Sequence, residues 1–301
     1  MKILIAGSHG MVGSTVTTYL KAQGHDVVCL IRQAPGPGEI RWDPDAGQID
    51  RAGLEGFDGA VNLASMPWPM RWSGKVRKAI LANRLATNGL LASSLAACER
   101  KPRVLLCASG MGYYPSSGDE VITEDCPPGT SFLAQFQQAG EAATASASKA
   151  GIRVVHLRIP QVIGGRALQY VGFRGGNGQQ WWSWIGRDEL ASIIEFALIT
   201  ESLRGPVNAV SPNPMRNVDF AAASTRALGL KPGSAMPALM VHLFMGDSGE
   251  EFVLASRRIQ PAKLLAAGYR FRFPDLATAL QHEKAVVDAA TAAASKESQP
   301  A

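Results

Sequence analysis

The sequence has no apolar run long enough to span a bilayer among its 301 residues, so we expect no membrane-embedded segment. Its first apolar stretch is only as long as a strand and ends in glycine, which is not the pattern of a secretory signal peptide. The four cysteines show no CxxC pair or other metal-binding spacing, and this usage suits a reducing compartment. These absences predict a cytoplasmic protein, and Cys29 and Cys107, in strand-like apolar runs, are expected to be buried thiols.

Several kinds of reactive site are missing as well. The five histidines form no HExxH motif or paired spacing, so we expect no metal site. Ser109 is not part of a GxSxG elbow, which argues against an α/β-hydrolase, and no base is signalled near Cys107. The formal net charge of +5 comes from scattered basic residues and not from a patch with interleaved aromatic residues. We therefore expect no nucleic acid as partner, and a small molecule as substrate.

The order of the apolar segments predicts an α/β fold. Strand-like runs alternate with helical patterns over the first half of the chain, which indicates a doubly wound parallel sheet of the Rossmann type. This nucleotide-binding domain is predicted to cover residues 1–165, with its sheet completed by segments near 204–212. Residues 166–290 predict a smaller, mostly helical C-terminal part on the substrate side. The small and polar residues of 291–301 predict a disordered tail.

The first thirteen residues carry the strongest functional signal. A strand-like run at 3–6 leads directly into Gly7, Gly10 and Gly13, and an amphipathic helical pattern follows. In such a turn the first glycine allows a tight exit from the strand, the second lets a diphosphate approach the backbone, and the third lets the helix pack closely. The helix N-terminus then attracts phosphate. We predict a dinucleotide site here; the alternative is a turn that serves packing alone.

Side chains near this turn bear on which dinucleotide binds. Arg32 directly follows the second strand-like run, where an acid would bind the ribose hydroxyls of NAD and an arginine faces a 2′-phosphate instead. Arg32 therefore favours NADP over NAD, unless it is an ordinary surface residue at a strand end. His9 either touches phosphate or is an exposed loop residue. The other loop residues expected to contact the cofactor are Ser8, Met11 and Val12.

Further motifs follow the glycine turn in a fixed order. They are Asn62-Leu-Ala-Ser65, Arg71-Trp72 with Lys75, Arg84 and Thr87, Ala108 to Tyr114, Leu157 to Pro160, Gln180 to Ile185, and Gly268 to Leu276. Together they resemble the extended or atypical branch of the short-chain dehydrogenase/reductase superfamily. More narrowly, they are similar to its NAD-dependent epimerase/dehydratase-like subgroup with a helical C-terminal extension of the DUF1731 type. The resemblance covers nearly the whole chain, from Met1 to about His282.

The resemblance implies where the rest of the cofactor would lie. The loop after the strand near residues 57–63 would pass the adenosine half, and two later strand ends would flank the nicotinamide. The residues expected to contact the cofactor through these motifs are Leu63, Ala64, Ser65, Arg84, Ala108, Pro160 and Val162. Members of the superfamily often form dimers, so a monomer and a homodimer both remain open.

The catalytic pair of the superfamily is absent. Its chemistry normally uses a tyrosine and a lysine four residues later on one helix, whereas none of the five tyrosines here has a lysine at that spacing. Counting back from Glu141 places the two positions at Leu133 and Gln137. Two further departures are Gly140, where the subgroup usually has tryptophan, and Gly186, where a histidine often stands.

Ser109 and Tyr113 are the remaining catalytic candidates. Ser109 ends a strand and either contacts substrate or closes a turn, and Tyr113 either donates a proton or packs in the core. A tyrosine with its ordinary pKa near 10 donates a proton more readily than it accepts one, which favours reduction. Trp181, Trp182 and Trp184 either line a substrate pocket or pack against the C-terminal helices.

Two hypotheses of different class follow. The first is an NADP(H)-binding, epimerase- or reductase-like oxidoreductase acting on a small carbonyl or hydroxyl compound. The second is a non-catalytic NADP-binding sensor or interaction protein, which the missing tyrosine–lysine pair motivates. Turnover of a carbonyl substrate would exclude the second.

Overall fold

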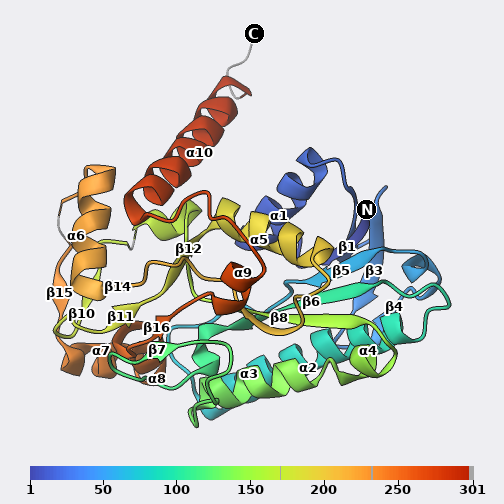
Figure 1. Ribbon diagram of the computed structural model, residues 1–301, viewed down its shortest axis with the longest axis horizontal. Coiled ribbons are helices and arrows are strands. Elements are labelled where there is room, and N and C mark those ends of the chain that lie inside the picture. Colours follow the sequence, from blue (N-terminus) through green and yellow to red (C-terminus); the bar gives the residue numbers. More distant parts are fainter. Residues whose placement is uncertain (170, 232, 298–301) are drawn as a thin grey trace.

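An eight-stranded sheet organises the first two thirds of the chain. The structure is a computed structural model and describes residues 1–169, 171–231 and 233–297 (Figure 1). The strand order is β13-β8-β6-β5-β1-β2-β3-β4, and every neighbouring pair is parallel except the β3–β4 hairpin. Because β1 lies between β2 and β5, the strand order reverses next to β1, as the Rossmann prediction requires. The strands are β1 (Lys2–Ala6), β2 (Asp26–Ile31), β3 (Glu39–Asp43), β4 (Gln48–Ile49), β5 (Gly59–Asn62), β6 (Val104–Gly110), β8 (Arg153–Ile159) and β13 (Gly205–Asn208).

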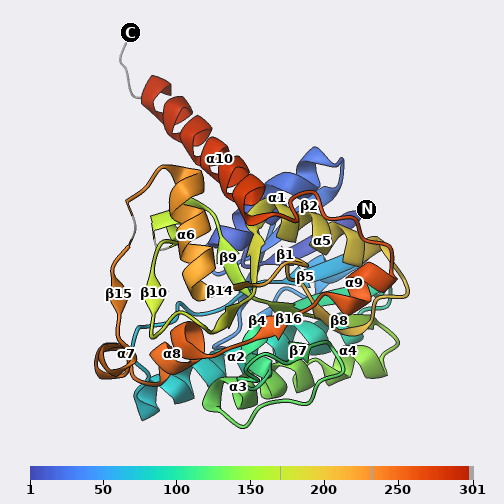
Figure 2. The same ribbon diagram turned by 60° about the vertical axis from the view of Figure 1, so that its left-hand side comes forward.

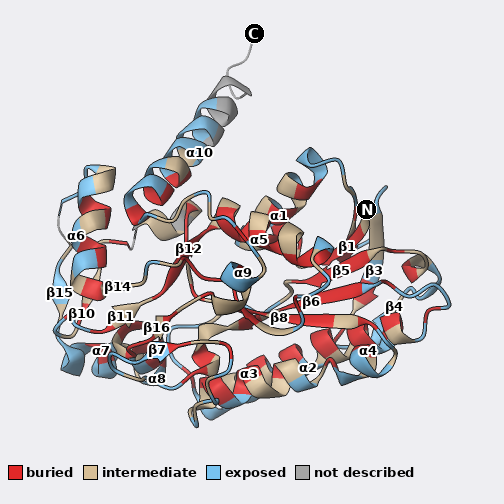
Figure 3. Ribbon diagram, viewed as in Figure 1, coloured by how far each residue is buried: buried red, intermediate tan, exposed pale blue. Residues whose placement is uncertain are grey.

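Helices cover both faces of the sheet (Figures 1 and 2). One face carries α1 (Met11–Ala22) and α5 (Arg187–Ile199). The other carries α2 (Gly74–Ala96), α3 (Phe132–Ala142) and α4 (Ala145–Lys149). The central strands β1, β5 and β6 are mostly buried, as Figure 3 shows, because both of their faces meet helices, whereas the edge strands β3 and β4 are largely half-buried or exposed.

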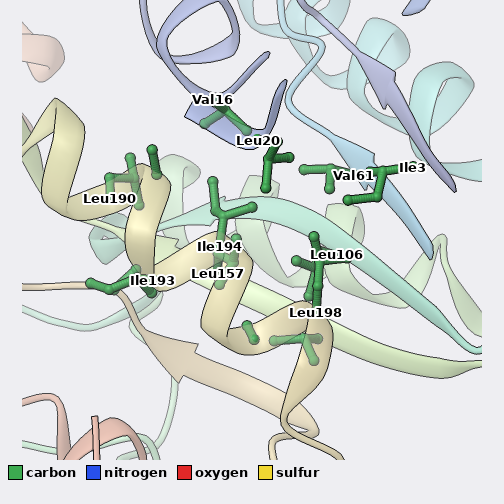
Figure 4. Close-up of a cluster of buried hydrophobic side chains, with 14 of the residues drawn as sticks. Ile3, Val16, Leu20, Val61, Leu106, Leu157, Leu190, Ile193, Ile194 and Leu198 are labelled. Atoms are coloured by element: carbon green, nitrogen blue, oxygen red, sulfur yellow. The ribbon is translucent and has the colours of Figure 1, made fainter. Parts of the chain in front are cut away.

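Successive residues of each strand enter different cores. Ile3 and Ile5 of β1 pack with α1 and α5, whereas Leu4 and Ala6 pack on the side of α2. Figure 4 shows the first of these clusters, in which side chains of α1 and α5 meet those of the strands. Such continuous burial explains why the strands read as unbroken apolar runs in the sequence.

Residues 132–149 form two helices, α3 and α4, with a break at Ala143 and Thr144. Helix α3 begins after Ser131, whose hydroxyl accepts from the Ala134 N–H at 3.2 Å, and ends at Ala142. At the break the Thr144 hydroxyl donates to the Glu141 carbonyl at 2.7 Å and contacts His156 Nε2 at 2.9 Å. These side-chain bonds compete with helix continuation, which the hydrophobic pattern could not reveal.

The C-terminal part is mostly helical, with short two-stranded pairs that hold it to the main sheet (Figure 2). The pairs are β9 (Gln161–Ile163) with β12 (Trp184–Gly186), β10 (Arg174–Gly175) with β15 (Ala235–Met236), β11 (Trp181–Trp182) with β14 (Met215–Arg216), and β7 (Val121–Ile122) with β16 (Arg258–Ile259). The helices are α6 (Asn217–Leu228), α7 (Ala238–Met245), α8 (Asp247–Gly249), a π-helical turn (Glu250–Leu254), α9 (Ala262–Ala266) and α10 (Leu276–Glu297). Short 3₁₀ turns lie at Ala52–Leu54, Met111–Tyr113 and Gly165–Gln169.

The predicted disordered tail is wrong for its first seven residues. Helix α10 continues to Glu297, and residues 298–301 lie outside the described part of the chain. Five of the six residues from 289 to 294 are alanine, the strongest helix former, and this propensity outweighs the lack of apolar periodicity.

The N-terminus of α5 is capped from a distant part of the chain. Gly186 precedes α5 and has no side chain to cap it. Instead Glu283 of α10 accepts the Arg187 N–H at 2.7 Å and forms an ion pair with the Arg187 guanidinium at 2.8 Å. This buried contact fastens α10 to a helix of the nucleotide-binding half.

The three tryptophans near residue 182 take different places. Trp184 is buried among Phe220 and the first turns of α10, and the Trp182 ring packs against Phe220 at 5.6 Å between centroids. These two pack against C-terminal helices, one of the two alternatives from the sequence. Trp181 lies between the guanidinium groups of Arg216 and Arg258.

Among the helices that the structure describes, none combines the length and apolar character that crossing a bilayer requires. Over all of the described residues, no three His, Cys, Asp or Glu side chains are grouped as a metal site. All four cysteines are free, and Cys29, Cys98 and Cys107 are buried. Burial raises the pKa of Cys107 to about 12, so this thiol stays protonated at neutral pH.

Candidate functional site

The glycine turn after β1 is packed tightly against its neighbours. Gly7 has φ of +83°, and a Cβ there would lie 2.6 Å from the Leu63 carbonyl carbon. A Cβ on Gly13 would overlap the Gly7 carbonyl oxygen. Helix α1 therefore starts directly beside β1 and β5, and only residues without a side chain fit at these two positions.

Gly10 behaves differently from the other two glycines. It precedes α1, and a Cβ on it would meet no protein atom closer than the Gly7 carbonyl oxygen at 3.4 Å. No side chain caps α1, so the first N–H groups of the helix have no side-chain acceptor. The Gly10 N–H itself donates to the Gly7 carbonyl at 3.1 Å, whereas the first N–H groups of α1 stand at the positive end of the helix dipole without a side-chain acceptor.

A single cavity of about 670 Å³ adjoins this turn. It lies at the carboxyl ends of β1, β2 and β5, where ligands bind in open parallel sheets. The structure brings eight of the predicted residues together around it: Gly7, Ser8, His9, Gly10, Arg32, Leu63, Ala64 and Ser65. His9 is exposed at its rim, and Ser8 Oγ lies 3.3 Å from His9 Nδ1.

Six lining residues were not among the sequence candidates: Leu30, Ile31, Gln33, Trp42, Met66 and Pro67. All of them except Trp42 lie within two positions of a predicted residue along the chain, so extending each motif by one or two positions would have found these five. Trp42 comes from β3, whose pairing with β2 places it beside the cavity. Nothing in the sequence linked Trp42 to the glycine turn.

Arg32 reaches from the end of β2 to the rim of the cavity. Its Nη1 lies 3.2 Å from Asp45 Oδ2, and the side chains are 51% and 63% exposed. Arg32 has no other hydrogen-bond partner among the described residues. Most of its five N–H donors are therefore available to a ligand.

A second polar cluster lies at the ends of β6 and β8. Ser109, the last residue but one of β6, donates its hydroxyl hydrogen to Glu141 Oε1 at 2.7 Å. Arg158 of β8 binds both carboxylate oxygens of Glu141 at 3.0 Å. Burial lowers the pKa of Arg158, but the hydrogen bonds and charge of Glu141 outweigh it and hold that pKa above its usual value. Glu141 therefore fixes both the serine and a buried cation.

Two tyrosines pack on the same arginine. The Arg158 guanidinium lies 3.4 Å from the centroid of the Tyr113 ring, and its Nη1 donates to the Tyr114 hydroxyl at 2.8 Å. Tyr114 in turn donates to Asn208 Oδ1 at 2.7 Å, and burial raises its pKa to about 12. The Tyr113 hydroxyl has no hydrogen-bond partner among the described residues. Tyr114 is thus structural, and Tyr113 keeps a free hydroxyl.

Arg84 connects the two regions. From α2 it donates to the Ala108 carbonyl at 3.2 Å and reaches Ser65 Oγ at 3.5 Å. Its side chain is 7% exposed, its Nε has no partner, and burial lowers its pKa. A buried guanidinium, with no carboxylate partner among the described residues, therefore lies between the ends of β5 and β6.

The positions of the missing catalytic pair are filled structurally. Leu133 is buried, and its side chain occupies the space that a Cβ on Gly112 would need. Gln137 contacts Ser109 Oγ at 3.4 Å through its side-chain oxygen. Gly140 lacks a side chain where the Arg84 chain passes, since a Cβ there would lie 2.9 Å from Arg84 Cγ.

The remaining predicted residues lie outside the cavity. Met11, Val12 and Gly13 form the first turn of α1. Ala108 and Ser109 lie on β6, Pro160 follows β8, and Val162 pairs with Ile185 in the β9–β12 pair. All of them lie next to strand ends, and Glu141 and Arg158 join Ser109 although the sequence analysis assigned them no role.

Comparison with known proteins identifies the family of the chain. The family model described as the NAD-dependent epimerase/dehydratase family matches residues 3–205. The chain belongs to the NAD-dependent epimerase/dehydratase family. A domain of unknown function, DUF1731, matches residues 236–283, so the expected helical extension of this family's subgroup is confirmed.

Relatives in the family match over almost their whole length. An epimerase family protein of Mycobacterium leprae is 32% identical over 292 residues, covering 93% of this chain and 94% of its own. The bovine epimerase family protein SDR39U1 is 33% identical, covering 93% and 99%.

Two solved structures share the fold of this chain over most of its length. The crystal structure of human epimerase family protein SDR39U1 with NADPH has a TM-score of 0.85 and 30% identity, covering 94% of this chain and 98% of that one. A nucleoside-diphosphate sugar epimerase from Corynebacterium glutamicum has a TM-score of 0.79 and 32% identity, covering 94% and 58%.

Proposed function

We propose that this protein is an NADP(H)-dependent, epimerase- or reductase-like oxidoreductase that acts on a small carbonyl or hydroxyl compound. The observation that carries the proposal is the cavity in which the glycine turn, Arg32 and Ala64–Ser65 face one another. A membership in an NAD-dependent family, and a relative solved with NADPH, support it.

The residues present fit the cofactor. Gly10 and the uncapped N-terminus of α1 suit a diphosphate. The Gly10 backbone is accessible, and the first N–H groups of α1 have no side-chain acceptor. Arg32 would hold the 2′-phosphate, with Leu63, Ala64 and Ser65 beside the adenosine half. Arg84, Ala108, Pro160 and Val162 would flank the nicotinamide half. Bound there, the nicotinamide supplies hydride transfer.

Ser109 would then transfer the proton between the substrate hydroxyl and Glu141. Because its hydroxyl hydrogen is donated to Glu141, its lone pairs are left to accept a hydrogen bond from a substrate hydroxyl. During oxidation Ser109 Oγ takes the substrate proton as its own proton passes to Glu141 Oε1; reduction runs the same transfers backwards. Tyr113, whose hydroxyl is free, is the alternative proton donor to a developing alkoxide.

Binding of NADPH and NADH to the purified protein, followed by cofactor fluorescence, tests the proposal. We expect NADPH to bind more tightly than NADH, and Arg32→Ala to weaken NADPH binding by about tenfold or more. Arg41→Ala is the matched control, since Arg41 is exposed on the neighbouring strand β3. Failure of both nucleotides to bind would overturn the proposed function.

A second candidate is a non-catalytic NADP-binding sensor or interaction protein. Buried Leu133 and Gln137 favour it, because they replace the tyrosine and lysine that normally move the proton. The two candidates share the cofactor site and differ in turnover. Oxidation of NADPH in the presence of any member of a carbonyl panel, lost in Ser109→Ala with NADPH affinity retained, would exclude the sensor.

A further inference from the structure

The β3–β4 hairpin places one carboxylate against Arg32 at the rim of the cofactor cavity. The Asp43 carboxylate accepts the backbone N–H groups of Asp45 and Ala46 at 3.1 and 3.2 Å, which fixes the start of the turn. Gly47 closes it with φ of +66° and donates to the Pro44 carbonyl at 3.2 Å. Asp45 is therefore held at the tip of a defined turn, in contact with Arg32 at the end of β2.

The Asp45 carboxylate already binds one nitrogen of the arginine that would hold the 2′-phosphate. Arg32 Nη1 lies 3.2 Å from Asp45 Oδ2, and the structure gives Arg32 no second partner among the described residues. Both side chains are more than half exposed, so this pair is weak and readily exchanged. A 2′-phosphate carries more charge and three acceptor oxygens, so it displaces a single carboxylate from a guanidinium.

We propose that Asp45 competes with the 2′-phosphate for Arg32 and thereby sets the selectivity between NADPH and NADH. The inference rests on the proposed function. When NADPH binds, Arg32 exchanges its carboxylate for the phosphate, and Asp45 is left close to a second anion. NADH carries no phosphate at this position, so its binding requires no such exchange. Asp45 therefore weakens NADPH binding selectively and narrows the difference between the two cofactors.

The test measures dissociation constants of NADPH and NADH for the full-length protein and for Asp45→Asn. We expect NADPH to bind the variant about three- to tenfold more tightly, with NADH changed less than about twofold, because one repulsive surface charge is removed. The gain in NADPH affinity should be smaller at about 0.5 M salt, because salt screens exposed charges. Asp26→Asn is the control: Asp26 is exposed at the opposite end of β2 and makes the same change in net charge.

A double variant separates competition from general repulsion. In an Arg32→Ala background, Asp45→Asn should improve NADPH binding less than it does in the parent protein, because the partner for which they compete is gone. An unchanged or lower preference for NADPH in Asp45→Asn, with NADPH still bound and still dependent on Arg32, would overturn the inference and leave the proposed function intact. Failure of NADPH to bind the parent protein would overturn both.

Discussion

Ser109 donates its hydroxyl hydrogen to Glu141 over 2.7 Å, and the same carboxylate pairs with Arg158. One side chain thus orients the candidate catalytic serine and neutralises a cation that is 3% exposed. A substitution of Glu141 therefore changes both the orientation of Ser109 and the charge balance at Arg158. The contact connects the end of β6 to α3, where the tyrosine–lysine pair would have stood.

Removing the carboxylate should destabilise the fold strongly. We expect Glu141→Ala to lower the free energy of unfolding by about 3 kcal/mol or more, because Arg158 is left buried without its ion-pair partner. Ser109→Ala should lower it by only about 1 kcal/mol, the usual loss for one hydrogen bond. Urea unfolding followed by circular dichroism measures both. Equal effects of the two variants would contradict a structural role for the Glu141–Arg158 pair.

Two glycines of the same turn should respond differently to alanine. Gly13→Ala places a Cβ on the Gly7 carbonyl oxygen, so the thermal midpoint should fall, corresponding to about 1–3 kcal/mol. Gly10→Ala has room for its Cβ in the protein and should keep the parent's thermal midpoint while NADPH affinity falls about tenfold or more. Thermal unfolding and fluorescence titration separate the two outcomes. Undiminished NADPH binding in Gly10→Ala would show that the diphosphate does not approach this backbone.

His156 should make the fold sensitive to mild acid. Burial lowers its pKa, with the charge of Glu141 opposing, so the folded protein holds the ring neutral below the pH at which the unfolded chain protonates it. The unfolded state then binds more protons, and stability falls as pH drops from about 7 towards 5.

Substitution of that ring provides the check. In His156→Gln the free energy of unfolding should depend less on pH over this range than in the parent, whatever its value at pH 7. Urea denaturation at several pH values gives both slopes. Identical slopes would assign the acid sensitivity to other groups.

Much of the fold follows from the order of the apolar segments. The strand-like runs became β1, β2, β5, β6 and β8 because buried parallel strands need apolar residues on both faces. The apolar pattern did not reveal the helix break at Thr144, where side-chain hydrogen bonds compete with the helix. Nor did it reveal the end of α10, where alanine propensity extends the helix without apolar periodicity.

The candidate site was predictable only where it is contiguous in the chain. The glycine turn and Asn62–Ser65 each form one segment, so their motifs identify the cavity walls. Trp42 reaches that cavity through the pairing of β3 with β2. Asp45 contacts the lining residue Arg32, and Glu141 reaches Ser109 by way of α3. Spatial neighbours that lie 13 or 32 residues apart leave no local pattern in a single sequence.

The cap that Glu283 places on α5 has a consequence for synthesis. A ribosome delivers the glycine turn first, and strands β1 to β8 emerge well before α10. The carboxylate that caps the N-terminus of α5 lies 96 residues after Arg187, so it is available only once residue 283 can fold against that helix. In a nascent chain α5 therefore has no side-chain acceptor for its first N–H groups until the start of α10 has been made and has docked.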